Sequence, residues 1–186
     1  MIRDQDRSGW FGASDVGMIM GNWSTKTFEK WWLQKLGLNT DRFVSTAMNA
    51  GTYYEHAVLE AVGAPRFDHQ ILLPELLLRV NLDGDAPGCI WECKTHKVEK
   101  AYKPTKAHVQ QVNVQMYAKL MTEKVLPDAV IVAYGLEEGD YRNFFREIDR
   151  SRIHTYPVGY DAGFIQSFLG RLERLAESLR KGEWPR

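Results

Sequence analysis

The stretch that most constrains the fold of this chain runs from Val80 to Lys94 and reads VNLDGDAPGCIWECK. Two extended segments flank the turn-forming residues 85–88, so the sequence predicts a β-hairpin. Side chains alternate along a strand, which places Glu92 and Lys94 on one face, and the hairpin brings Asp83 opposite Glu92 or close to it. Two carboxylates and a lysine then share one patch of sheet. Oxygen ligands of this kind suit Mg²⁺ or Mn²⁺.

The motif Asp-(x)n-Glu-x-Lys is weak evidence when taken alone, because all three residue types are common in proteins. Asp85 lies at the same strand parity as Asp83 and is an alternative ligand. We favour Asp83 because glycine follows it. The case for a metal site therefore depends on what the surrounding elements supply.

The spacing of apolar residues, together with the positions of glycine and proline, predicts the other helices and strands. Helices are expected from Ser14 to about residue 20, over 27–36, from about Thr46 to Val62, over 105–123 and over about 160–181. Strands are expected over 67–73, 75–83, 89–96, 128–134 and 141–148. This order predicts one α/β (α+β) domain with a central mixed sheet flanked by helices.

Two of the predicted helices carry polar side chains beside their apolar faces. Glu55 lies close to the apolar face of the helix over 46–62, where a carboxylate needs a partner or a metal. In the helix over 105–123, Gln111 and Gln115 are i,i+4 neighbours. The aromatic stripe of the helix over 27–36 is expected to lie in the core.

The composition of the chain limits the functions and the cellular compartment that can be expected for it. The 186 residues carry 24 basic and 24 acidic side chains, so the net charge argues against a protein that coats nucleic acid. A zero net charge does not argue against a local basic groove. Cys89 and Cys93 would lie about 13 Å apart on one strand, too far for a disulfide, which indicates a reducing compartment. The sequence shows no signal peptide and no long apolar run. We expect a cytoplasmic protein, in a bacterium or a phage-infected host, with no membrane partner.

Five motifs in the same order resemble the PD-(D/E)xK nuclease superfamily. More narrowly, they resemble the phage lambda-type exonucleases and the YqaJ-like viral recombinase group. The matching segments are Arg7–Asp15, Gly51–Glu55, Leu82–Gly84 (with leucine in place of the family's proline), Trp91–Lys94 and Val109–Met116. The resemblance covers about residues 7–120.

The resemblance implies a restriction-endonuclease-like core and one nuclease domain over residues 1–186. Within it, residues 1–45 form an arm and helices that bind the DNA end, 46–150 the catalytic core and 151–186 the C-terminal helix. The implied activity is Mg²⁺- or Mn²⁺-dependent hydrolysis of duplex DNA from a 5′ end, with one or two ions, in recombination or repair. Implied partners are double-stranded DNA ends, a single-strand annealing protein and further copies of the chain in a ring.

The resemblance also implies roles for individual residues. Asp83, Glu92 and the backbone carbonyl of Cys93 bind the metal, and Glu55 approaches it directly or through water. Lys94 acts on the attacking water or on the phosphate charge. Gln111 positions the water or the scissile phosphate, although the register leaves Asn113 and Gln115 as alternatives. Two further residues, Arg7 and Ser14, match positions that hold a 5′-terminal phosphate.

A basic stretch follows the predicted metal strand. Its lysines, with only Glu99 as a nearby acid, are expected to contact the DNA backbone; they are Lys97, Lys100, Lys103 and Lys106. Three other functions stay open: a structure-selective endonuclease of the same superfamily, a non-catalytic DNA-binding or inhibitor protein on this fold, and a protein-interaction module. A complete set of Glu55, Asp83, Glu92 and Lys94 favours catalysis, because a binder has no use for acids beside phosphates.

Overall fold

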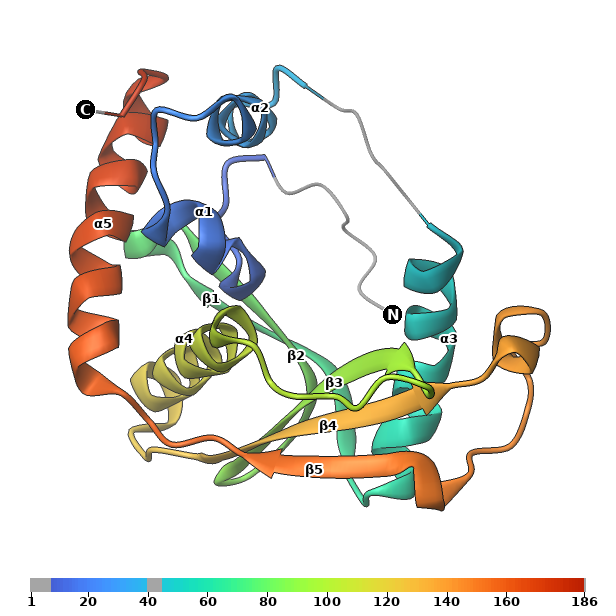
Figure 1. The fold of residues 1–186 in the computed structure, drawn as a ribbon. Coiled ribbons are helices and arrows are strands. Elements are labelled where there is room, and N and C mark those ends of the chain that lie inside the picture. The colour runs from blue at the N-terminus through green and yellow to red at the C-terminus, as the bar shows by residue number, and fades with distance from the viewer. Residues whose placement is uncertain (1–7, 40–44, 186) are drawn as a thin grey trace.

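A five-stranded mixed sheet forms the centre of the protein in the computed structural model, which describes residues 8–39 and 45–185. The strands follow one another across the sheet in chain order, and only the β3–β4 pair is parallel. They are β1 (Arg66–Leu73), β2 (Leu78–Ala86), β3 (Cys89–Lys97), β4 (Asp128–Leu136) and β5 (Ile153–Pro157). The predicted fold class, a mixed sheet flanked by helices, is confirmed (Figure 1).

The four longer helices begin at residues whose side chains cap them. Thr25, Ser45, Thr105 and Asp161 each accept a hydrogen bond from the backbone N–H three residues further on. The helices are α1 (Val16–Met20), α2 (Lys26–Lys35), α3 (Thr46–Ala61), α4 (Lys106–Glu123) and α5 (Ala162–Lys181), with short 3₁₀ turns η1 (Ala13–Asp15), η2 (Pro74–Leu76), η3 (Glu138–Tyr141) and η4 (Arg150–Arg152). Within the described residues, no helix has both the length and the apolarity needed to span a membrane.

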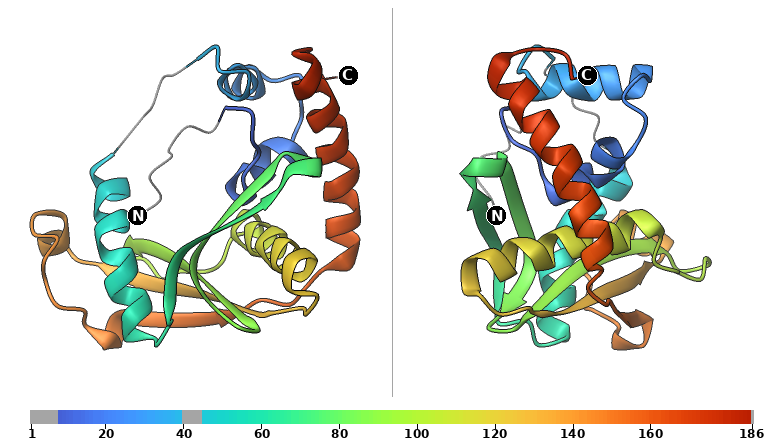
Figure 2. Two further views of the ribbon diagram at one scale, coloured as in Figure 1. Left: turned by 180° about the vertical axis from the view of Figure 1, so that it is seen from behind. Right: turned by 90° about the vertical axis from the view of Figure 1, so that its left-hand side faces the viewer.

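Helices cover both faces of the sheet, with α3 on one face and α4 on the other (Figures 1 and 2). The larger apolar cluster joins α1, α2, α4 and α5 to the sheet, and the smaller one lies between α3 and the sheet. In α2 the aromatic side chains Phe28, Trp31 and Trp32 are buried, as predicted for a core stripe. Burial of aromatic rings of this size is a major source of core stability.

Two glycines let α3 lie close to the strands. A Cβ atom at Gly51 would lie 3.1 Å from Thr95 Oγ1 of β3. On β2, a Cβ at Gly84 would lie 3.2 Å from the Cβ of Ala64. Both glycines belong to motifs recognised in the sequence, and this close packing brings Glu55 of α3 to the strands that carry Asp83 and Glu92.

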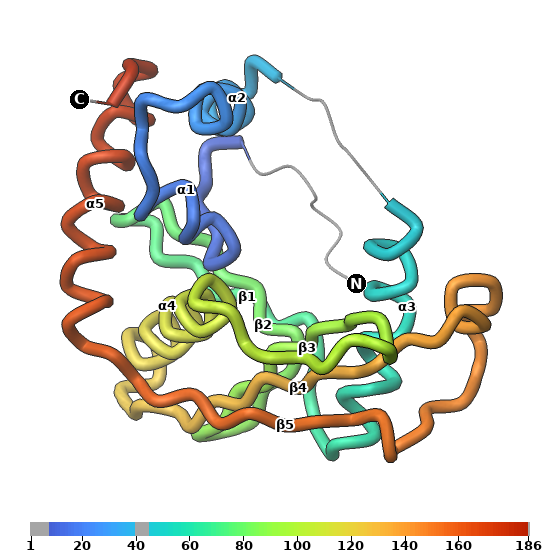
Figure 3. Tube along the Cα trace, in the orientation of Figure 1, coloured from blue at the N-terminus to red at the C-terminus, as the bar shows by residue number. Residues whose placement is uncertain are grey.

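Two local predictions are wrong. The segment 141–148 is not a strand: its start belongs to η3, and the chain then runs as a loop along α3, while the fifth strand is β5 (Figure 3). The segment beyond residue 150 therefore holds a strand as well as the C-terminal helix. Ser14 lies in the turn η1, and α1 begins only at Val16.

Candidate active site

Strands β2 and β3 pair only beside their turn. Their ladder runs from Ala86↔Cys89 to Gly84↔Trp91 and stops there. At the next position the Asp83 carboxylate accepts a hydrogen bond from the backbone N–H of Cys93 at 2.9 Å. Because the N–H and C=O of one residue point to the same edge of a strand, the Cys93 carbonyl also points toward β2. The separation of the two strands thus exposes backbone and side-chain oxygens together.

A cleft of about 660 Å³ opens above this separation. It lies between the segment Trp10–Ser14, the first half of α3, the strands β2 and β3, and α4. The five side chains predicted to take part in catalysis line it, namely Glu55, Asp83, Glu92, Lys94 and Gln111. The structure therefore brings together residues that lie up to 56 positions apart in the chain.

Both carboxylate oxygens of Glu92 are held by neighbouring side chains. Lys94 Nζ and Gln111 Nε2 donate to Oε1 at 2.5 and 2.6 Å, and Gln115 Nε2 donates to Oε2 at 2.5 Å. Lys94 Nζ also donates to Gln111 Oε1 at 3.3 Å. Glu92 is only 2% exposed, and these donors fix its orientation.

Asp83 and Glu55, two further acids of the cleft, are held in unfavourable electrostatic surroundings. Burial raises the pKa of Asp83 well above its ordinary value, and the nearby Glu92 and Glu55 add to the effect. Burial likewise raises the pKa of Glu55 to about 7, with further contributions from Glu92 and Asp68. Clustered carboxylates of this kind are characteristic of sites that bind a cation or transfer protons.

Lys94 is the cation beside these acids. Burial lowers its pKa, but the negative charge of Glu92 and Asp83 outweighs this, so the pKa of Lys94 lies above its ordinary value. Its ammonium group is therefore protonated at neutral pH and directed at Glu92.

Asp68 is a cleft residue that the sequence analysis missed. It has a φ of 55°, a conformation uncommon outside glycine, and it interrupts the β1–β2 ladder at the position opposite Asp83. Ligand atoms of Glu55, His56 and Asp68 lie within 4.8 Å of one another, and His56 Nε2 is 3.0 Å from Asp68 Oδ2. The spacing of residues in the sequence gave no sign of this, because the contact depends on a local break in β1.

Asp85 does not line the cleft, although it has the strand parity of Asp83. Its buried carboxylate is bound by Arg66 of β1, by Lys119 of α4 at 3.0 Å and by His69 Nδ1 at 3.0 Å. Of the two alternative acids, the structure therefore places only Asp83 beside Glu92.

The three polar candidates of α4 point in two directions. Gln111 and Gln115 both bind Glu92. Asn113 instead donates to the carbonyl of Gly159 at 3.2 Å and accepts from the N–H of Asp161 at 2.6 Å, so it connects α4 to the start of α5. Residues two positions apart on a helix do not share a face, which explains the difference.

The N-terminal motif forms one wall of the cleft. Ser14 is exposed and lines the cleft, whereas Arg7 lies outside the described residues. Asp15 is buried and accepts hydrogen bonds from Lys35 Nζ at 2.6 Å and Trp31 Nε1 at 2.9 Å, so its role is to hold this segment on α2. Arg79 of β2 also lines the cleft and adds a cation that the sequence analysis did not single out.

The four lysines of the basic stretch are exposed and do not line the cleft; they are Lys97, Lys100, Lys103 and Lys106. They lie at the end of β3, in the following loop and at the start of α4.

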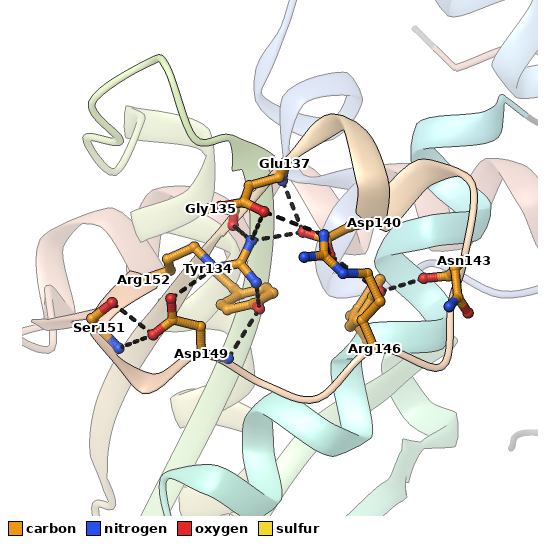
Figure 4. Close-up of polar contacts among 10 residues, drawn as sticks. Tyr134, Gly135, Glu137, Asp140, Asn143, Arg146, Asp149, Ser151 and Arg152 are labelled. Atoms are coloured by element: carbon orange, nitrogen blue, oxygen red, sulfur yellow. Dashed lines mark hydrogen bonds and ion pairs between the residues drawn. The ribbon is translucent and has the colours of Figure 1, made fainter.

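A buried charged network anchors the helix that carries Glu55 (Figure 4). Asp140 is fully buried and accepts hydrogen bonds from Arg152 at 2.7 Å and from Arg146 at 2.9 Å. The hydroxyl of Tyr54, the residue before Glu55, donates to the carbonyl of Asn143 at 2.7 Å. These bonds hold the loop after β4 against α3, and they are the reason why residues 141–148 do not form a strand.

Comparison with known proteins shows which solved structures share this fold. The sequence matches no family model and no curated protein. Solved structures do match: an alkaline exonuclease (LHK-Exo) from Laribacter hongkongensis has a TM-score of 0.69 at 16% identity, covering 95% of this chain and 90% of its own. The same exonuclease in complex with dAMP gives 0.70 at 18% identity, with the same coverage. A phage-related exonuclease from Haemophilus somnus 129PT gives 0.64 at 14%, covering 93% and 96%. The chain therefore has the fold of these alkaline and phage-related exonucleases, which is the fold that its sequence motifs predict.

Proposed function

We propose that this protein is a divalent-cation-dependent deoxyribonuclease that degrades duplex DNA from a 5′ end. The observation that carries the proposal is the convergence of Glu55, Asp83, Glu92 and Lys94 on one cleft. Solved structures with this fold are described as exonucleases, and one of them is bound to dAMP. This supports a DNA substrate for the present chain.

The residues of the cleft fit a hard cation. The donors are carboxylates and a backbone carbonyl, which is the oxygen set that Mg²⁺ or Mn²⁺ prefers. Burial raises the pKa of both Asp83 and Glu55, the neighbouring carboxylates add to the rise, and a cation would offset this repulsion. Asp83, Glu92 and the carbonyl of Cys93 would hold one ion, with Glu55 close to it or to a second.

When bound, a divalent cation lowers the pKa of water and neutralises charge on the phosphate. The chain supplies the positioning. Gln111 and Gln115 fix both oxygens of Glu92, while the Lys94 ammonium group lies where it can orient a water molecule or stabilise the charge of the phosphate. Ser14 and Arg79, on the wall of the same cleft, are suited to bind a terminal phosphate, together with the predicted Arg7.

The basic lysines would bind the DNA backbone outside the cleft. Assembly into a ring and association with an annealing protein stay predictions from the resemblance, as does a role in recombination or repair.

The first test compares DNA ends. In Mg²⁺, 5′-phosphorylated linear duplex is expected to be degraded faster than duplex with 5′-hydroxyl ends, and closed circles are expected to persist. Ser14→Ala is expected to reduce the preference for the phosphate. Cutting of circles would favour the endonuclease alternative. A wild-type protein that binds DNA in a salt-dependent manner but cleaves neither substrate would favour the non-catalytic alternative.

The second test detects metal binding as a rise in the thermal stability of the protein. Saturating Mg²⁺ is expected to raise the Tm of the wild type by roughly 5–10 °C, since a ligand at a hundred times its Kd stabilises by about 2.7 kcal/mol. Asp83→Asn is expected to abolish the rise, because it removes a charged ligand. Glu60→Gln, an exposed acid on α3, is the matched control and should retain the rise. An equal Mg²⁺ response in Asp83→Asn would exclude Asp83 as a ligand.

A further inference from the structure

A second pocket, of about 310 Å³, lies on the same face of the sheet as Glu92 and Lys94. Register places Lys94 beside Ala133, which in turn pairs with His154, so these residues form a row across β3, β4 and β5. His96 follows Lys94 on the same face of β3, about 7 Å along the strand. The pocket is lined by His96, Val98, Lys100, Ala101, Tyr102, Gly135, Ser151, Arg152, His154 and Tyr156.

The lining of this pocket is basic. It includes one lysine, one arginine and two histidines, and none of the lining residues is acidic. Lys100 is exposed and, among the described residues, its side chain has no hydrogen-bond or ion-pair partner. Its charge is therefore available to a ligand.

Two buried nitrogen atoms of the pocket lack hydrogen-bond partners: His96 Nε2 and Arg152 Nε. Within the described part of the chain, no other buried side-chain nitrogen or oxygen lacks one, and both residues line this pocket. Buried polar atoms in folded proteins are almost always satisfied, so two exceptions in one basic pocket indicate a ligand-binding function.

The guanidinium group of Arg152 is fixed in place by its other nitrogens (Figure 4). Nη1 donates to Asp140 at 2.7 Å and to the carbonyl of Gly135 at 3.1 Å, and Nη2 donates to the hydroxyl of Tyr134 at 2.5 Å. Asp149 Oδ2 forms a long ion pair with Nε at 3.6 Å, beyond hydrogen-bond distance, and Glu137 Oε2 lies 3.8 Å from Nη1. The Nε–H is therefore a pre-positioned donor on a residue that is only 9% exposed.

The second unpartnered atom belongs to a histidine whose other nitrogen is bound. His96 Nδ1 lies 2.9 Å from the carbonyl oxygen of Lys97, which assigns a proton to Nδ1. Nε2 is then an acceptor in the neutral ring and a donor in the imidazolium form.

Tyr102 forms one wall of the pocket. Its ring contacts His96 and Tyr156, and its hydroxyl lies 2.8 Å from His108 Nδ1 of α4. Burial raises the pKa of Tyr102 to about 12.

We infer that this pocket binds a phosphate group of a nucleic acid, through Lys100, Arg152 and His96. The inference rests on the proposed function, since the phosphate would belong to the strand that passes the cleft or to a nucleoside monophosphate released from it. A volume of about 310 Å³ accommodates a phosphate with its attached sugar.

The test is a titration of the full chain with inorganic phosphate in EDTA, followed by the backbone amide NMR signals of residues 96–101 and 151–154. Saturable shifts are expected in both segments. Lys100→Glu is expected to weaken the apparent Kd by roughly tenfold or more, as loss of a charge-assisted contact predicts. Lys30→Glu makes the same change of net charge at an exposed position of α2 and should leave the Kd unchanged. An absence of shifts in these segments, or an equal effect of Lys30→Glu, would overturn the inference.

Two further ligands identify the source of the phosphate. A nucleoside 5′-monophosphate and a dinucleotide with one internal phosphodiester are each titrated under the same conditions. Tighter binding of the first assigns the pocket to a released product, and tighter binding of the second to the strand backbone. Failure of both to shift the two segments would overturn the inference.

The experiments distinguish a failure of this inference from a failure of the proposed function. Mg²⁺-dependent cleavage of linear duplex by the wild type, without phosphate shifts, would contradict the pocket alone. Phosphate binding in a protein that cleaves no DNA would contradict the proposed function.

Discussion

Lys94→Ala is expected to lower the rate of DNA cleavage by about 10³-fold while leaving DNA binding in EDTA nearly unchanged, in the range typical for loss of a group acting in the transition state. The ammonium group of Lys94 is the cation that contacts Glu92, at 2.5 Å. Its raised pKa keeps it charged where negative charge would develop on the phosphate. Single-turnover rates at saturating Mg²⁺ measure the chemical step.

The matched control for this variant is Lys30→Ala, which removes an exposed lysine from α2. It should cleave at the wild-type rate. Cleavage undiminished by Lys94→Ala would remove the assigned role of the lysine. A parallel loss of DNA binding would assign Lys94 to substrate affinity instead.

Asp85→Asn is expected to lower the free energy of unfolding by about 3 kcal/mol, because it removes one of the two acidic partners of a buried cation. Lys119 is fully buried and lies 3.0 Å from Asp85 Oδ2. Glu123, 2.9 Å from the same ammonium group, remains as a partner and places the loss at the lower end of the usual range. Urea denaturation measures the change, and Asp128→Asn, an exposed aspartate at the start of β4, should change stability little.

The difference in stability between the wild type and Asp85→Asn is also expected to depend on pH. Burial alone would raise the pKa of Asp85, but the bonds from Arg66, Lys119 and His69 outweigh it and lower the pKa to about 2. A pKa lower in the folded than in the unfolded state stabilises the protein above about pH 4, and this contribution is lost as pH falls toward 2. The stabilities of wild type and Asp85→Asn should therefore converge below pH 4. A constant difference across this range would contradict the ion pairs described for Asp85.

Local sequence signals predicted most elements correctly. The helices expected from about Thr46 and from residue 105 begin within one residue of the observed starts of α3 and α4, and the predicted turn residues 85–88 include the turn between β2 and β3. These features act over a few residues, so they can be recognised without knowledge of the fold.

The wrong strand at 141–148 shows where such signals fail. The segment YRNFFREI alternates polar and apolar residues in part, but Arg146 binds the buried Asp140 and Phe144 stacks on Tyr53 of α3. The true edge strand, Ile153–Pro157, is short and carries exposed polar residues. Tertiary contacts decided both outcomes.

The sequence by itself determined the order of the motifs and hence the fold, together with the candidate acids Glu55, Asp83 and Glu92. Only the tertiary structure showed that Asp83, and not Asp85, lies in the cleft beside Glu92, because both have the same strand parity and differ in which neighbours reach them. It also separated Gln111 and Gln115 from Asn113, and it added Asp68 and the basic pocket around Arg152. Strand alternation and helix periodicity fix the face on which a side chain lies, whereas its partner depends on segments that are brought together only when the chain has folded.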